Sequence, residues 1–240
     1  MITKNQLKLV HQLEQKKIRQ REQLFVAEGP KVVGDLLQHG YHPTLLFATE
    51  NWGPDTILVT EEELRRLSFL QHPQQVLAVF PIPSDHAMHL PEKGELCLAL
   101  DGVQDPGNLG TIIRIADWFG IQHIYCSQDT ADVWNPKVIQ ATMGSIARVH
   151  IYYCNLEKLI SGSQLPVYGT LLDGNDIYQQ PLSADGIIVM GNEGKGISVP
   201  IRQLITRKLL IPNFSTQADT AESLNVAIAT AITCSEFRRR

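Results

Sequence analysis

Unbroken apolar runs alternate with helix-like patterns along the second half of this chain. The runs LCLALDG (96–102) and GIIVMGN (186–192) are apolar at nearly every position. Such runs are typical of strands that are buried on both faces of a parallel sheet. The segments between and after them, among them NLGTIIRIADWFG (108–120) and DTAESLNVAIATAITCSEF (219–237), have the spacing of helices. We therefore predict a doubly wound α/β domain over residues 96–240.

A smaller α/β domain is predicted over residues 1–82. Apolar residues recur at helical spacing within 4–22, which predicts one amphipathic helix, and short strand and helix patterns follow it. Residues 83–95 contain prolines, lack periodicity and are predicted to be a linker. His86 and His89 lie in that linker, and we expect exposed histidines there in preference to a metal site, so no metal is predicted.

Composition and charge narrow the class of protein. The chain has 240 residues, 43% of them hydrophobic, and its four cysteines include no C-x-x-C pair, which fits a reducing cytoplasm. No apolar segment is long enough to cross a membrane, and we expect a cytoplasmic protein. The net charge is −4. Residues 1–24 nevertheless hold six basic residues against two acidic ones, the basic ones being Lys4, Lys8, Lys16, Lys17, Arg19 and Arg21. On charge alone we favour a solvated helix face there.

The loop after the strand at 96–101 leads into a helix that contains one arginine. Asn108 is expected to cap this helix, whose N-terminal N–H groups would favour an anion. Arg114 stands among isoleucines and alanine, so it either extends to the rim of a site, extends past apolar neighbours to solvent, or pairs with Asp117.

The loop after the strand at 186–190 is rich in glycine. It reads Gly-Asn-Glu-Gly-Lys-Gly over 191–196. A phosphate-binding Walker loop would need Ser or Thr directly after its lysine, and a dinucleotide-binding loop a third glycine where Val199 stands, so both interpretations fail. Glu193 would also repel a phosphate.

A third loop begins at Ile211-Pro212, and after it Ser223, Leu224 and Asn225 open the last helix, where a serine or an asparagine is most often a cap. Asp219 and Glu222 are spaced as a capping box for that helix. In open α/β sheets ligands bind at the carboxyl ends of the strands, where all three loops are expected to lie.

Taken in order, the three loops resemble the three motifs of the SpoU/TrmH branch of the SPOUT RNA methyltransferases. The motifs are N-x-G-x-x-x-R (108–114), G-N-E-G-x-G (191–196) and I-P followed by E-S-L-N-V (222–226). The resemblance covers about residues 96–232. A weaker one, through FVAEGPKVV (25–33) and VLAVF (76–80), is to the RNA-substrate-binding domain of many members.

The resemblance implies an S-adenosylmethionine-dependent 2′-O-ribose methyltransferase acting on RNA. It implies a catalytic domain with a C-terminal trefoil knot, a homodimer, and ribosomal RNA as a more favoured substrate than transfer RNA. The catalytic residues would be Asn108, Arg114, Glu193, Ser223 and Asn225. The cofactor would contact Thr170, Gly191, Gly196, Ile211 and Leu224. The third loop is longer than in the common family pattern, so residues 213–221 receive no role.

Our hypothesis for Arg114 differs from a role as general base. A guanidinium has a pKa above ~12 and is almost never neutral. We expect Arg114 to bind the phosphate beside the target ribose, with Glu193 orienting Arg114 or hydroxyl groups, and Ser223 and Asn225 fixing the last loop. A transfer RNA methyltransferase and a non-catalytic RNA-binding module are the alternatives, and a nucleotide-binding enzyme is a weaker third.

Overall fold

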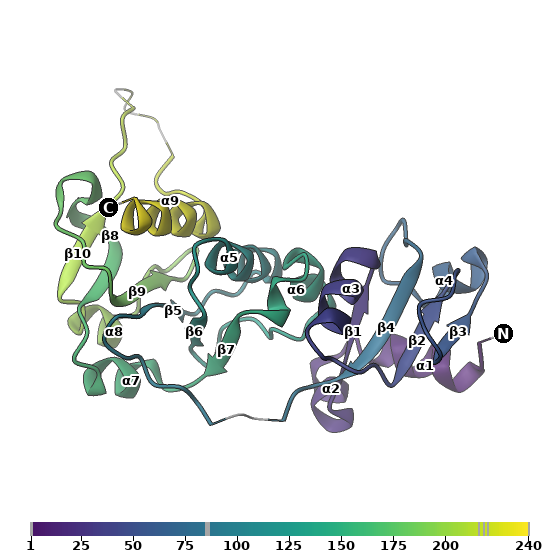
Figure 1. Ribbon diagram of the computed structural model, residues 1–240. Coiled ribbons are helices and arrows are strands. Elements are labelled where there is room, and N and C mark those ends of the chain that lie inside the picture. The colour runs from purple at the N-terminus through teal and green to yellow at the C-terminus, as the bar shows by residue number, and fades with distance from the viewer. Residues whose placement is uncertain (1, 85–86, 216, 218, 220, 240) are drawn as a thin grey trace. The chain divides into compact units, whose positions relative to one another are not determined.

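The computed structural model describes residues 2–84, 87–215, 217, 219 and 221–239 (Figure 1). The chain forms two compact units. One comprises Met1–His86 with Asp132–Arg148, and the other comprises Ala87–Ala131 with Val149–Arg240. Each unit contains its own sheet, and the predicted domain limits at 82 and 96 stay a prediction.

The first unit is built on a four-stranded sheet with the order β1-β4-β2-β3. Its strands are β1 (Leu24–Glu28), β2 (Leu45–Ala48), β3 (Thr56–Leu58) and β4 (Val76–Pro81). Strand β4 is antiparallel to both β1 and β2 and is almost fully buried, so it forms the centre of this core. The helices of the unit are α1 (Lys4–Gln12), α2 (Lys16–Glu22), α3 (Pro30–Gln38), α4 (Glu61–Leu67) and α6 (Pro136–Ala141), with a 3₁₀ turn at Ser145–Ala147.

The single helix predicted over 4–22 is instead two helices, α1 and α2. The break is stabilised by Arg19, whose side chain is buried and whose Nη1 donates to the carbonyl oxygens of Leu13 and Glu14. Its Nε and Nη2 donate to Asp132. Carbonyls that a continuous helix would have paired thus find a cationic donor. Arg19 is therefore not part of the solvated helix face that the sequence predicted.

The second unit contains a six-stranded, wholly parallel sheet with the order β10-β8-β9-β5-β6-β7. Its strands are β5 (Leu96–Asp101), β6 (His123–Cys126), β7 (His150–Tyr153), β8 (Val167–Asp176), β9 (Gly186–Gly191) and β10 (Arg207–Leu210). The two most apolar runs of the sequence, β5 and β9, lie side by side in the middle. The prediction of an α/β domain with a parallel sheet is confirmed, and the trefoil knot stays a prediction.

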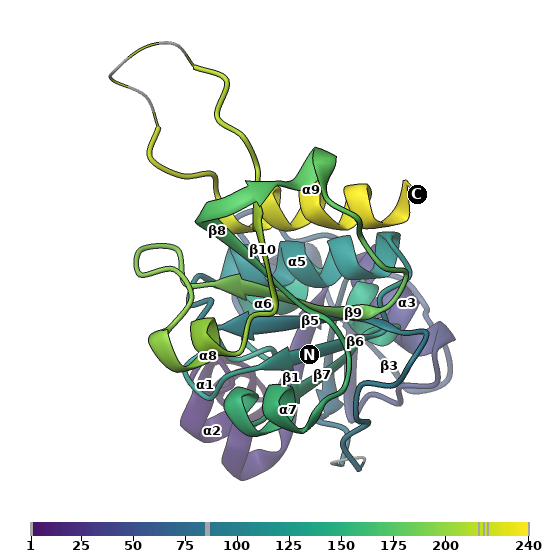
Figure 2. The same ribbon diagram turned by 90° about the vertical axis from the view of Figure 1, so that its left-hand side faces the viewer.

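Helices cover both faces of this sheet (Figures 1 and 2). Helices α5 (Pro106–Trp118) and α9 (Val226–Arg238) lie together on one face, and α7 (Leu156–Gly162) and α8 (Val199–Gln203) lie on the other. Cys97 and Ala99 of β5 pack with α7 and α8. Their neighbours Leu98 and Leu100 therefore face α5 and α9, because side chains alternate along a strand. A further 3₁₀ turn spans Ile177–Gln179.

The last helix begins later than its sequence pattern predicted. It starts at Val226, and Asn225 is its N-cap, whose Oδ1 accepts from the N–H groups of Ala227 and Ile228. The capping box expected of Asp219 and Glu222 is therefore wrong, since both residues precede the true cap by several positions. No helix in the described ranges is long and apolar enough to span a bilayer.

Candidate active site

The first two loops of interest begin side by side at the carboxyl edge of the parallel sheet. Asp101 and Gly191 are the last residues of β5 and β9, and they are register partners in the ladder. The carboxylate of Asp101 accepts a hydrogen bond of 2.7 Å from the backbone N–H of Ser198, beyond the glycine-rich loop. The two loops are thus fixed to each other from their first residues.

Three residues from the three loops form one hydrogen-bonded chain. The Nδ2 of Asn108 donates to Oε1 of Glu193 at 3.0 Å. The Oδ1 of Asn108 accepts from Nδ2 of Asn225 at 2.9 Å. Asn108 therefore joins the loops after β5, β9 and β10, and three of the five predicted catalytic residues lie in direct contact.

Asn108 is available for this role because it does not cap its helix. The N-cap of α5 is Asp105, whose carboxylate accepts from the backbone N–H of Asn108 at 2.8 Å. The predicted cap was wrong by three residues, and the amide of Asn108 extends from the first turn. The carboxylate of Glu193 also lies 3.4 Å from the backbone nitrogens of Gln104 and Asp105. The carboxylate of Glu193 is therefore the anion at this helix N-terminus, where the sequence had predicted that an anion would be favoured.

The glycine-rich loop is closed by Asn192, for which the sequence suggested no role. Its Oδ1 accepts from the N–H groups of Gly194 and Lys195, and its Nδ2 donates to the carbonyl of Gly102 at 2.7 Å. Only the position of Asn192 within the motif could have indicated it. A Cβ on Gly191 would lie 2.4 Å from the backbone carbon of Gly196, so glycine at 191 is required by close backbone approach.

Arg114 lies two turns into α5 and is exposed to solvent. Within the described part of the chain its guanidinium has neither a hydrogen bond nor an ion pair. Of the two roles predicted for Glu193, orientation of Arg114 is not seen, because Glu193 binds Asn108 and the start of α5; orientation of substrate hydroxyl groups stays a prediction. A cation held on a rigid helix without a protein partner can bind an anionic ligand without first breaking an internal pair.

The remaining predicted residues do not form a joined cluster within the described part of the chain. Thr170 is half-buried in β8, with Oγ1 3.5 Å from the sulfur of Met190. Ile211 follows β10, and Leu224 is 50% exposed. Ser223 is exposed and has no hydrogen bond to any residue that the structure describes.

This arrangement matches known proteins. Residues 95–235 match the model of the SpoU rRNA methylase family, and residues 4–78 match an MRM3-like substrate-binding domain. The chain belongs to the SpoU rRNA methylase family. The family resemblance inferred from the three motifs is therefore confirmed, and with it the enzyme class.

Some relatives of this SpoU family member align over nearly its whole length. The 23S rRNA (guanosine(2553)-2′-O)-methyltransferase RlmP of Bacillus subtilis is 31% identical over 236 residues, covering 92% of this chain and 90% of its own. A putative TrmH-family RNA methyltransferase structure from Porphyromonas gingivalis is 41% identical, with a TM-score of 0.88 and coverage of 100% and 99%. An AdoMet-bound rRNA methyltransferase from Sinorhizobium meliloti is 33% identical, with a TM-score of 0.86 and coverage of 100% and 96%.

Proposed function

We propose that this protein transfers a methyl group from S-adenosylmethionine to a ribose 2′-hydroxyl of ribosomal RNA. The observation that supports this most strongly is the hydrogen-bonded chain of Asn108, Glu193 and Asn225 beside the unpaired Arg114. A non-catalytic RNA-binding module would not need these groups joined at one sheet edge. The relatives named for rRNA 2′-O-methylation favour ribosomal RNA, and a transfer RNA substrate is the alternative.

The glycine-rich loop and the segment around Leu224 fit an S-adenosylmethionine molecule. Gly196 has open space where a Cβ would stand and a φ of +70°, so the backbone there can approach a ligand closely, while the tight packing of Gly191 on the backbone of Gly196 fixes the shape of the loop. Leu224 presents an apolar surface, 50% exposed, next to Asn225. We assign Thr170, Gly191, Gly196, Ile211 and Leu224 to the cofactor pocket, where the bound sulfonium supplies an electron-poor methyl group.

Arg114 is assigned to the RNA phosphate next to the target ribose. Its planar fork suits bidentate binding of phosphate, and its fixed charge would stabilise negative charge that develops on the attacking oxygen. The proton of the ribose hydroxyl then leaves through that phosphate or through water, since a guanidinium is a poor base.

Asn108, Glu193 and Asn225 are assigned to positioning. Their chain fixes the first turn of α5 against the other two loops, so the helix that presents Arg114 cannot shift independently of the cofactor loop. Correct placement of reacting groups can contribute several kcal/mol to a rate, on the order of 7–11 kcal/mol in the best intramolecular cases. Ser223 adjoins this chain, and we assign its free hydroxyl to the bound substrate.

The N-terminal helices supply a basic surface for RNA. Five of the six basic residues of segment 1–24 are exposed, namely Lys4, Lys8, Lys16, Lys17 and Arg21. A local positive face attracts RNA although the net charge is −4. We assign the first unit to substrate binding.

We further propose that the enzyme is a cytoplasmic homodimer. Helices α5 and α9 pack together and expose large apolar side chains, with Trp118 85% and Ile228 53% exposed. Exposed apolar side chains on paired helices are typical of a protein interface. Trp118 lies one turn beyond Arg114 on α5, so a second subunit docked there would adjoin the active site. All four cysteines are free, which supports a reducing compartment.

Methyl transfer can be tested with labelled S-adenosylmethionine and, separately, unmodified ribosomal and transfer RNA. We expect label in ribosomal RNA as 2′-O-methylribose, lost with Arg114→Ala. Arg202→Ala is the matched control, because Arg202 is another exposed arginine of the same unit but is paired with Asp173. Label in transfer RNA alone would favour the alternative substrate. No label in either RNA, with S-adenosylmethionine bound, would count against the proposal.

A further inference from the structure

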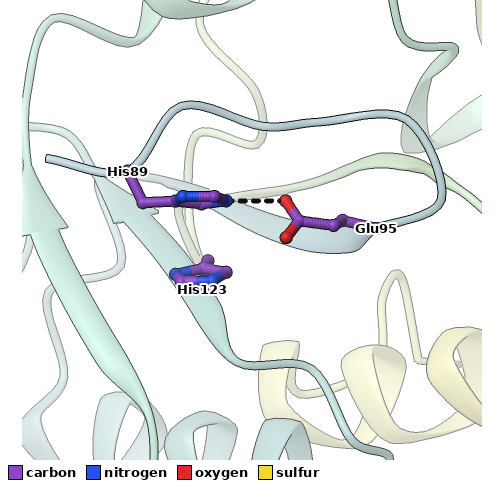
Figure 3. Close-up of side chains that lie close together, drawn as sticks. All are labelled: His89, Glu95 and His123. Carbon is purple, nitrogen blue, oxygen red and sulfur yellow. Dashed lines mark hydrogen bonds and ion pairs between the residues drawn. The ribbon is translucent and has the colours of Figure 1, made fainter.

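A cluster of two histidines and a glutamate lies at the opposite edge of the parallel sheet from the active site (Figure 3). Glu95 immediately precedes β5, His123 is the first residue of β6, and His89 lies in the segment before β5. The amino ends of parallel strands share one edge, whereas the loops of the active site follow the carboxyl ends. The cluster is therefore separate from the methyl-transfer site.

The three side chains bring their possible ligand atoms close together. One nitrogen of each histidine and one oxygen of Glu95 all lie within 4.8 Å of one another. The Nε2 of His89 is 2.8 Å from Oε2 of Glu95, and the ring of His89 stacks on that of His123 with centroids 4.2 Å apart. Two further contacts hold the segment before β5 in place. Glu95 accepts from the N–H of Glu92 at 3.1 Å, and the hydroxyl of Tyr125 donates to the carbonyl of His89 at 3.0 Å.

One atom of this cluster lacks a partner. Nδ1 of His123 is buried without a hydrogen bond, and among the described residues it is the one buried side-chain nitrogen or oxygen of which this is true. Leaving such a group unpaired is unfavourable, because it has given up its hydrogen bonds to water and gained none in return. An unsatisfied imidazole nitrogen therefore belongs to a residue of the same cluster, beside a second imidazole and a carboxylate.

We propose that His89, Glu95 and His123 bind a divalent transition-metal ion of the Zn²⁺ type. Two imidazoles and one carboxylate are a donor set that zinc accepts, with water at the fourth position. Ca²⁺ and Mg²⁺ are disfavoured, because both take oxygen ligands almost exclusively. Zinc holds its ligands at about 2.0–2.2 Å, so the ion would replace the hydrogen bond between His89 and Glu95.

The position of the cluster indicates a structural role for the ion. It would join the segment before β5 to the start of β6 and so fix the chain that leads into the catalytic unit. The three ligands lie at the amino edge of the sheet, whereas the active-site loops follow its carboxyl edge. Metal binding should therefore raise the melting temperature without changing S-adenosylmethionine affinity.

The test is a titration of tag-free protein with Zn²⁺ by calorimetry and with Co²⁺ by visible absorption. We expect one equivalent to bind, with the strong visible bands of four-coordinate Co²⁺ and no sulfur-to-metal charge-transfer band. The absence of a charge-transfer band would exclude Cys97, which lies near Glu95, as a ligand of the metal. Replacing a group that merely supports a ligand weakens metal binding about 10–100-fold, so His89→Gln, Glu95→Gln and His123→Gln should each weaken it more than tenfold.

His150→Gln is the matched control. His150 starts β7 and stacks on His123 with centroids 5.5 Å apart, yet it is exposed and is not one of the converging ligands. Its replacement should leave the affinity within about twofold of the unaltered protein, since it removes no ligand. The proposal is overturned if no Zn²⁺ binds at equimolar protein concentration, or if His150→Gln weakens binding as much as His123→Gln.

Discussion

Asn108 and Glu193 are joined by a 3.0 Å hydrogen bond between residues 85 positions apart in the sequence. The direction of this bond fixes the orientation of the asparagine, because an ionised carboxylate can only accept. Nδ2 must therefore face Glu193, which leaves Oδ1 to accept from Asn225. The two hydrogen bonds that join the three loops therefore allow only one orientation of the Asn108 amide.

Asn108→Asp should damage the enzyme more than Asn108→Ala. The aspartate keeps the acceptor for Asn225 but places a second carboxylate against Glu193, whereas alanine only removes the contacts. A hydrogen bond to a charged group is worth about 1.5–3 kcal/mol, so Asn108→Ala should lower kcat/KM about 10–100-fold. Adding Glu193→Gln to Asn108→Asp restores a donor and an acceptor, and part of the activity should return. If the double variant is no better than Asn108→Asp alone, the contact does not position the loops.

Gly191→Ala should disrupt the cofactor loop, whereas Gly194→Ala should not. An added Cβ at 191 would lie 2.4 Å from backbone atoms of Gly196 and Ile197, and backbone cannot move aside cheaply. At 194 the nearest atom is the Oδ1 of Asn192, at 3.7 Å. Overpacking typically costs about 1–3 kcal/mol, so S-adenosylmethionine affinity and melting temperature should both fall for the first variant. Calorimetric binding to the two purified variants checks this, and equal affinities would refute the close-approach explanation.

The sequence predicts the architecture well because the strands have a local pattern. Continuous apolar runs such as 96–100 and 187–190 fix the central strands without knowledge of their neighbours. The ends of the helices are predicted less well. Asp105 and Asn108 are both good caps, and nothing local decides between them; the choice depends on Glu193, which engages the amide of Asn108.

Contacts between distant segments explain the other differences. The pattern of 4–22 suits one helix, but Arg19 binds Asp132, more than a hundred residues later, and the helix breaks before it. His89 was expected to be exposed, yet it is half-buried on His123 and bonded to Glu95. Glu95 is the last residue of the linker, but His123 comes from β6, so spacing within the linker could not reveal the cluster. His86 lies outside the described residues.

Glu28→Gln should make stability less dependent on pH. Burial raises the pKa of Glu28 above 4.5, although hydrogen bonds from Ser68 and the N–H of Phe69 oppose the rise. A raised folded pKa favours folding below the unfolded value, and this contribution is lost as pH rises through the folded value. Glutamine can accept from Phe69 and donate to Ser68 at any pH. The urea midpoint of Glu28→Gln relative to the unaltered protein should therefore increase between pH 4 and pH 7.

The same measurement on Glu61→Gln provides the comparison for Glu28. Glu61 is an exposed glutamate in the first turn of α4, so its replacement changes the charge without removing a buried carboxylate. Its relative midpoint should stay nearly constant over this pH range. A matching rise in Glu61→Gln would show that net charge, not burial at Glu28, controls the effect.

Trp118→Glu should dissociate the proposed dimer. The indole is 85% exposed on α5, and a carboxylate in its place would be buried without a partner at the interface. Val199→Glu is the control, because Val199 is 68% exposed but lies on α8, on the other face of the sheet. Sedimentation velocity should give a monomer for the first variant and a dimer for the second. Dimers in both would place the interface elsewhere.

Arg114→Lys separates a phosphate clamp from a general base. Lysine keeps the charge but loses the planar fork, so a clamp predicts a fall of about 10–100-fold in kcat/KM. Because Arg114 is exposed and unpaired, the melting temperature and S-adenosylmethionine affinity should not change. The pH–rate profile then decides the role. A lysine has a pKa near 10.4, well below that of arginine, so a base at this position would make the variant gain activity steeply as pH rises toward that value. A clamp instead predicts a profile parallel to that of the unaltered enzyme at every pH, and full activity with an unshifted profile would rule out bidentate binding.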